Sequence, residues 1–117
     1  MSCLLLYNDI KVIGETVMST SIEFVDYVYE NLKPLGDIKC KKMFGEYGLW
    51  YKGKFFGCIC DNQLFIKDTA SGRKILGKDI LFASPYEGAK EHIVIENIED
   101  KNTLIDLIIN TYDELIK

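Results

Sequence analysis

Histidine, arginine and proline are scarce in this sequence of 117 residues, and long apolar runs are missing. The single histidine, His92, belongs to no Ser/His/Asp or Cys/His pattern of the kind that nucleophilic catalysis uses. The single arginine, Arg73, argues against sequence-specific DNA recognition, because arginine makes the commonest specific base contact. No apolar run approaches the ~20 residues that cross a bilayer. The sequence therefore favours a non-enzymatic protein that does not span a membrane.

The composition is that of one folded domain. An apolar share of 48% can build a core, and 27% charged and 12% aromatic residues are typical of globular chains. The net charge of −4 argues against a protein that binds nucleic acid over its whole surface. The apolar stretch at residues 3–7 is too short for a signal peptide, and no positive charge precedes it. We therefore expect a cytoplasmic location.

The four cysteines, Cys3, Cys40, Cys58 and Cys60, form no C-x-x-C pair of the kind that structural zinc sites usually contain. Cys58 and Cys60 instead have the spacing that puts two side chains on one face of a strand. Cytoplasmic thiols stay reduced. We expect buried thiols that pack as small apolar groups, and no metal or other cofactor.

A first helix is predicted over about residues 21–33, where apolar side chains recur at spacings of three and four residues. Thr20 and Glu23 have the spacing of a capping box, in which the hydroxyl accepts from a free amide and the carboxylate reaches back. Pro34 and Gly36 follow and predict the end of the helix.

From residue 38 the apolar period changes to two, which is the period of strands. Four short strands are predicted over about residues 38–67. Lys52-Gly53 and Asp61-Asn62 stand between strands at hairpin-turn spacing, where glycine or asparagine accepts the positive φ of a tight turn. These features predict an antiparallel meander with one face packed on helices.

The last third of the chain is less regular. A short helix is predicted near residues 69–76, and residues 80–83 are consistent with either a strand or a buried loop. The β-branched segment 92–96 predicts the last strand. A final helix begins near Asp100 or Asn102, either of which can cap it.

The order of elements predicts an α+β fold, with an antiparallel sheet of about five strands flanked by an N-terminal and a C-terminal helix. We place the compact domain at residues 18–117. Residues 1–17 are rich in apolar side chains, and two interpretations stay open for them: an upstream extension, or an extra strand or hairpin packed on the domain.

The stretch Met43-Phe44-Gly45-Glu46-Tyr47-Gly48-Leu49-Trp50 looks like a signature. Its G-x-x-G pattern lies between strands and opens no helix, unlike a phosphate-binding loop. A KH-type RNA clamp also uses G-x-x-G, but between two helices. We interpret the glycines as permitting a bend or bulge and the aromatics as core or cross-strand groups. A ligand or partner surface centred on this stretch is the alternative.

This signature resembles that of the TfoX/Sxy family of competence regulators, in their N-terminal domain. The family motif shows a basic residue before Met-Phe-Gly-Gly-Tyr-Gly, then a strand, a glycine turn and a second strand. The matching residues are Lys42, Met43, Phe44, Gly45, Tyr47 and Gly48. The resemblance covers about residues 19–116. It implies a secretion-chaperone-like α+β architecture and a non-enzymatic interaction or regulatory module linked to transcription control.

Three departures from the family pattern affect what can be carried over. Glu46 stands where the family usually has glycine, so a backbone with positive φ there is in doubt. The proline common before the final helix is missing. The helical C-terminal domain of the full-length regulators is also missing, so the resemblance implies a stand-alone N-terminal module.

Charge is polarised along the chain, with a net +4 between residues 33 and 67 and a net −5 between residues 91 and 117. The alternative function is therefore weak, non-specific nucleic-acid binding through a lysine-rich, aromatic sheet surface. Strand lysines that protect a sheet edge explain the same pattern. The principal expected partner is a protein, and a second copy of the chain is another candidate. Candidate surface residues for nucleic acid or a partner are Lys39, Lys41, Lys42, Trp50, Lys52 and Lys54.

Overall fold

The computed structural model describes residues 20–43 and 46–117. The expectations for residues 1–17, for Cys3 and for Phe44 and Gly45 lie outside the described residues. The elements, in chain order, are α2 (Ile22–Leu32), η2 (Lys33–Leu35), β1 (Ile38–Met43), β2 (Glu46–Tyr51), β3 (Lys54–Cys60), β4 (Gln63–Ile66), α3 (Ala70–Leu76), β5 (Leu81–Ala83), β6 (His92–Ile95) and α4 (Lys101–Leu115).

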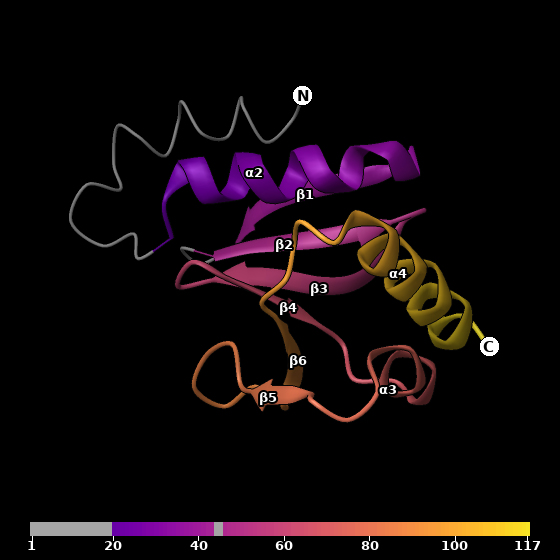
Figure 1. Ribbon diagram of the computed structural model, residues 1–117. Helices are drawn as coiled ribbons and strands as arrows, with labels where there is room; N and C mark the ends of the chain where they lie inside the picture. Colours follow the sequence, from indigo (N-terminus) through magenta and orange to yellow (C-terminus); the bar gives the residue numbers. More distant parts are fainter. Residues whose placement is uncertain (1–19, 44–45) are drawn as a thin grey trace.

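The strands form one antiparallel sheet in the order β1-β2-β3-β4-β6-β5. The three described α-helices lie on one face of it (Figure 1). The α+β fold predicted from the sequence is confirmed. The sheet has six strands instead of about five, because the segment near residue 82, which fitted a strand or a loop, forms the edge strand β5.

The core lies between this face and the helices. Alternation along each strand and spacing of three or four residues along each helix turn apolar side chains toward one layer. The fully buried members are large aliphatic and aromatic side chains: Val28, Leu32, Leu49, Phe56, Ile59, Leu64, Ile66, Ile93, Leu107 and Ile108. The apolar stripe predicted for the first helix is confirmed, since Val25, Val28 and Leu32 are its buried residues.

Both predicted hairpin turns are confirmed. Lys52 and Gly53 have φ values of 50° and 81°, and Asp61 and Asn62 have φ values of 51° and 57°. Two successive residues with positive φ match the twist of the flanking strands, which is why tight hairpins use them. The turns fix the registers of β2 with β3 and of β3 with β4.

The predicted cap of the first helix is wrong by one residue. The N-cap is Ser21, whose hydroxyl accepts from the Phe24 amide at 3.2 Å. Thr20 is buried, and its hydroxyl accepts from the Asn62 amide at 3.3 Å. Thr20 is therefore committed to the turn between β3 and β4, which leaves capping to its neighbour. The short helix α3 lies within one residue of the predicted range, with Thr69 as N-cap and Gly77 as C-cap.

A bulge between β2 and β3 separates the aromatic residues. The register shifts between Leu49, which pairs with Gly57, and Trp50, which pairs with Phe55. Phe56 is therefore the extra residue, and it is fully buried in the core under the helices. Its neighbour Phe55 joins Trp50 on the other face of the sheet. This shift explains why the aromatics of this region fit no single alternating pattern.

Candidate functional site

The face of the sheet opposite the three described helices, called the open face below, carries most of the chemically distinctive side chains. Register and alternation place on it Lys39, Lys41, Met43, Glu46, Gly48, Trp50, Phe55, Cys58, Cys60, Phe65, Val94 and His92. Cys58, Cys60, Phe65 and Val94 form a second buried apolar cluster there, separate from the main core.

Gly48, the second glycine of the signature, lies inside β2 opposite Lys41 and Cys58. A Cβ at this position would lie 2.7 Å from Trp50 Cη2 and 3.2 Å from Met43 Sδ. The indole of Trp50 therefore packs directly on the backbone of Gly48. The bulge follows one residue later. This contact is a structural reason for the glycine and the tryptophan to occur together in the signature.

Glu46 takes an ordinary strand backbone, since it is not among the described residues with positive φ. The departure from glycine at this position therefore puts no strain on the chain. What it adds is a half-buried carboxylate. Burial raises the pKa of Glu46, the neighbouring Cys60 thiol lowers it, and the charge of Asp61 raises it again.

The candidate surface residues divide between the faces. Lys39 pairs with Trp50, and the Lys41 ammonium lies 5.8 Å from the Trp50 ring centroid, so these three share the open face. Lys42 pairs with Tyr47, which is buried in the main core, and so belongs to the helix face.

Two further lysines of that set also lie away from the open face. Lys52 stands in a turn, with its ammonium 5.3 Å from the ring of Tyr51 and 5.6 Å from that of Tyr112 on α4. Lys54 pairs with Tyr51, which lies on the helix face. The six candidate residues therefore do not form one surface.

A cavity of about 600 Å³, called the open-face pocket below, lies along β3. The sequence did not single it out, because its residues come from four strands, from the residue after β4 and from the loop between β5 and β6. Its lining consists of Met43, Glu46, Tyr47, Phe55, Cys58, Cys60, Lys67, Tyr86, Ala89, Lys90 and His92. Its lining is mainly apolar, which is the usual character of a small-molecule site.

Two thiols lie in the wall of this pocket. Cys58 Sγ accepts a hydrogen bond from Cys60 Sγ at 3.8 Å. The bond lowers the pKa of Cys58, because it favours the thiolate, whereas the same bond and burial raise the pKa of Cys60. Cys40, Cys58 and Cys60 are all buried, as the sequence predicted. Among the described residues, no group of three or more histidine, cysteine or acidic side chains is arranged to hold a metal ion.

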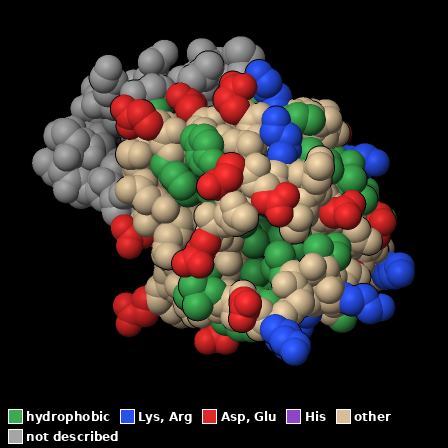
Figure 2. Space-filling view, viewed as in Figure 1, with side chains coloured by type: hydrophobic (Ala, Val, Ile, Leu, Met, Phe, Trp, Pro, Cys, Tyr) green, Lys and Arg blue, Asp and Glu red, His purple; other side chains and the backbone are tan. Residues whose placement is uncertain are grey.

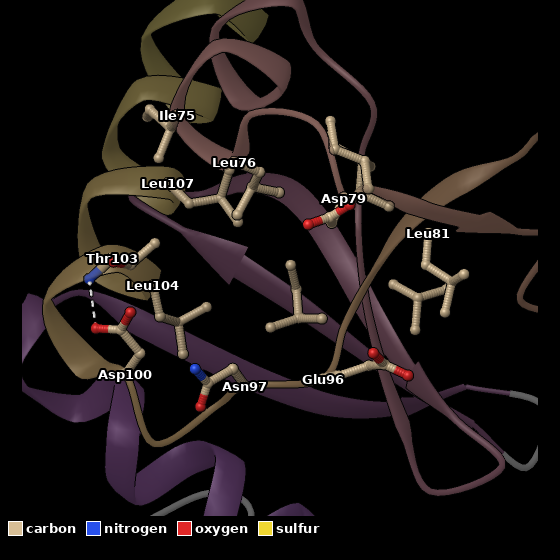
Figure 3. A pocket seen from close by; sticks show the side chains of 14 residues that line it. Ile75, Leu76, Asp79, Leu81, Glu96, Asn97, Asp100, Thr103, Leu104 and Leu107 are labelled. Carbon is tan, nitrogen blue, oxygen red and sulfur yellow. Dashed lines mark hydrogen bonds between the residues drawn. The ribbon is translucent and has the colours of Figure 1, made fainter.

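A second hollow, of about 390 Å³, opens between α3, α4, β5 and β6 on the helix side. Figure 2 shows apolar side chains gathered near the middle of this face with acidic side chains around them. Leu76, Leu104 and Leu107 supply apolar surface, and Asp79, Glu96 and Asp100 supply carboxylates (Figure 3). We call this the acidic hollow. Among the residues described, no lysine or arginine lines it.

The only sign of the acidic hollow in the sequence is the acidic excess after residue 91. The pairing of β5 with β6 and the packing of α3 on α4 bring Asp79 into the same place. Asp100 also caps α4, since its carboxylate accepts from the Thr103 amide at 3.5 Å. Neither of the two ion pairs among the described residues, Lys33–Glu30 and Arg73–Asp68, involves an acid of this hollow.

In the described part of the chain, no helix has the length and apolar character needed to cross a membrane. Comparison with known proteins identifies a family and a relative. A family model described as the TfoX N-terminal domain matches residues 30–114. A protein of Spirochaeta aurantia, described as an uncharacterized 12.7 kDa protein in the trpE 5' region, is 30% identical over 84 residues, which are 72% of each chain. The family match runs from β1 through most of α4 and includes the whole signature, and on it the chain belongs to the TfoX N-terminal domain family.

Proposed function

We propose that this chain is a non-enzymatic, cytoplasmic interaction module with a regulatory role, and that it docks a segment of a partner protein in the acidic hollow. The partner segment carries apolar side chains flanked by lysine or arginine. The observation that carries this proposal is the combination of an apolar floor with carboxylates and no basic group among the described lining residues.

The physical chemistry of the acidic hollow favours such a segment. Ile93, Leu104 and Leu107 are buried at its base, and Leu76 and Ile80, which also line it, are only partly buried. An apolar side chain placed there gains about 25 cal/mol for each Å² that leaves water. Asp79 and Glu96 then select partners of positive charge and steer their approach. Family membership supports a regulatory role, since the family is associated with competence regulation.

A synthetic peptide of alternating leucine and lysine tests the proposal, with a leucine–glutamate peptide of equal length as control. Binding is followed by amide chemical shifts in NMR titrations. We expect shifts around Leu81, Glu96 and Leu104 with the basic peptide alone. The double variant Asp79→Lys, Glu96→Lys should weaken binding at least tenfold, whereas Glu23→Lys on α2 should not. Equal binding of both peptides, or binding that the double variant does not change, would contradict the proposal.

Weak nucleic-acid binding is the second candidate, because Lys39 and Lys41 share the open face with Trp50. It predicts binding of a single-stranded oligonucleotide that weakens steeply with salt. Lys39→Glu with Lys41→Glu should abolish it. Lys42→Glu is the matched control, because register places Lys42 on the other face. Absence of binding at low salt, or equal loss with Lys42→Glu, removes this candidate.

A further inference from the structure

The open-face pocket has chemically different ends. Glu46 lies at one end, next to the Cys60 thiol at the last residue of β3. Lys67 lies at the other, where its amide donates to Phe56 O at 2.8 Å and its ammonium sits 5.3 Å from the Phe55 ring. Phe55 and Cys60 are five residues apart, which is about 16 Å at ~3.3 Å per residue in a strand.

The basic end is a cluster. Lys67, Lys90 and His92 line the pocket together, and the same three also line a smaller neighbouring hollow. The Nδ1 atom of His92 lies 2.8 Å from Lys90 O, and because a carbonyl only accepts, Nδ1 carries the proton. An acidic group placed among two ammonium groups gains charge-assisted hydrogen bonds.

The acidic end has an unused acceptor. Glu46 Oε1 is buried and has no hydrogen-bond partner. A buried acceptor without a partner costs about 1–3 kcal/mol. Burial also raises the pKa of the Glu46 carboxyl, in keeping with poor hydration of its charge. A donor brought to this atom by a ligand would remove the cost. Between the two ends, the walls are Met43, Phe55 and the thiols of Cys58 and Cys60.

We propose that the open-face pocket binds an elongated, largely apolar small molecule that carries an acidic group at one end and an amine at the other. The acidic group lies between Lys67 and Lys90, and the amine donates to Glu46. A chain of roughly a dozen carbon atoms, joined by bonds of about 1.5 Å, covers the distance. Neither the family match nor the docking proposal for the acidic hollow assigns a ligand to this face.

Three aliphatic probes separate the contributions of the two ends: 12-aminododecanoate, dodecanoate and dodecylamine. Each is titrated by calorimetry below the concentration at which it self-associates, and the fluorescence of Trp50 on the same face gives a second readout. We expect 12-aminododecanoate to bind most tightly, about tenfold better than dodecanoate. A tenfold ratio is what one charge-assisted hydrogen bond provides.

Two sets of variants test which end of the pocket binds the amine and which end binds the carboxylate. Glu46→Gln should remove the preference for 12-aminododecanoate over dodecanoate. Lys67→Gln with Lys90→Gln should weaken the binding of 12-aminododecanoate and of dodecanoate at least tenfold, and should leave the affinity for dodecylamine unchanged. Glu23→Gln and Lys74→Gln, which are exposed on α2 and α3, serve as matched controls and should change nothing. Thermal unfolding of every variant checks that the fold is kept.

Equal affinity for the three probes would show adsorption to apolar surface and would overturn the proposal. So would the absence of saturable binding, or a preference for 12-aminododecanoate that survives Glu46→Gln. Amide shifts confined to β3, β6 and the loop between β5 and β6 would support it. Because the docking test uses a different face and different variants, either proposal can fail without the other.

Discussion

At the scale of single residues, the contact between Gly48 and Trp50 explains more of the signature than backbone freedom does. Among the described glycines, Gly36, Gly53, Gly77 and Gly88 have positive φ, and Gly48 does not. Any other residue at position 48 would have a Cβ atom in place of a glycine hydrogen, and that atom would overlap the Trp50 ring. The ring in turn packs edge-on against Phe55, with centroids 5.3 Å apart. A small residue is therefore needed where the indole crosses the strand.

Gly48→Ala should lower the free energy of unfolding by about 1–3 kcal/mol, the range for overpacking. The new methyl group forces the Trp50 ring away from Gly48 and Phe55. Urea unfolding followed by far-UV circular dichroism measures the change. In a Trp50→Leu background the same substitution should cost much less, because the ring that it overlaps is gone. Equal costs in both backgrounds would show that the ring is not the cause.

Gly57→Ala provides a comparison of another kind. Its Cβ would overlap the backbone carbonyl of Phe65 in β4, which cannot rotate away as a side chain can. We expect a larger loss of stability than for Gly48→Ala, by the same urea measurement, and no rescue by Trp50→Leu.

At the scale of elements, Asn62 ties the start of α2 to the hairpin of β3 and β4. Its side-chain oxygen accepts from the Ser21 backbone amide at 2.7 Å, and its backbone amide donates to the Thr20 hydroxyl. Asn62→Gly keeps the backbone conformation, because glycine accepts a φ of 57°, and removes only the side-chain acceptor. We expect a loss of about 0.5–1.5 kcal/mol in the free energy of unfolding, measured by urea unfolding.

Asp61→Gly is the matched control for that variant. Asp61 also has positive φ in the same turn, and the Ser21 contact stays intact without its side chain. Stability should therefore stay unchanged or rise slightly, since a residue with a side chain is replaced by glycine in a left-handed conformation. A similar loss for both variants would show that the turn, not the contact with Ser21, is responsible.

Sequence predicts these elements well where the cause is local. The turn pairs Lys52-Gly53 and Asp61-Asn62, the stripe of α2 and the ends of α3 all depend on a few adjacent residues. The cap of α2 was missed because Thr20 and Ser21 are chemically equivalent caps, and a contact with Asn62, 42 residues away, decides between them. Strand β5 cannot be distinguished from a buried loop in the sequence, because three residues carry too little periodicity to identify a strand.

At the scale of the whole molecule, neither cavity could be predicted from the sequence. The lining of the acidic hollow joins Asp79 after α3 to Glu96 after β6 and Asp100 before α4, and only the sheet order and helix packing make them neighbours. The open-face pocket likewise depends on the bulge that turns Phe55 and Phe56 to opposite faces. The lysine pattern was visible, but register decides which lysines share a face.

Two carboxylates should give the molecule opposite contributions to its stability as pH changes. Glu114 on α4 accepts from the Ser71 amide at 2.9 Å, the Ser71 hydroxyl at 2.7 Å and the Ala70 amide at 3.1 Å. These bonds lower the pKa of Glu114, those to Ser71 most. A depressed pKa contributes stability that is present above the unfolded value of about 4.3 and is lost as pH falls through the folded value.

The contribution of Glu46 to stability changes with pH in the opposite direction, because burial raises the pKa of its carboxyl. Its contribution is most favourable below the unfolded value of about 4.3 and is lost as pH rises through the folded value. Glu46→Gln should therefore stabilise the protein at neutral pH, by no more than about 1 kcal/mol, since water still screens this partly exposed group. The gain should shrink as pH falls toward 4.

Urea unfolding of the wild type, Glu46→Gln and Glu114→Gln between pH 3.5 and 7 tests both signs together. Relative to the wild type, Glu46→Gln should gain stability as pH rises, and Glu114→Gln should lose it over the same range. The opposite slopes matter because a general effect of lowering the negative charge would move both variants in one direction. Parallel slopes would show that net charge, and not the surroundings of each carboxylate, sets the pH dependence of this fold.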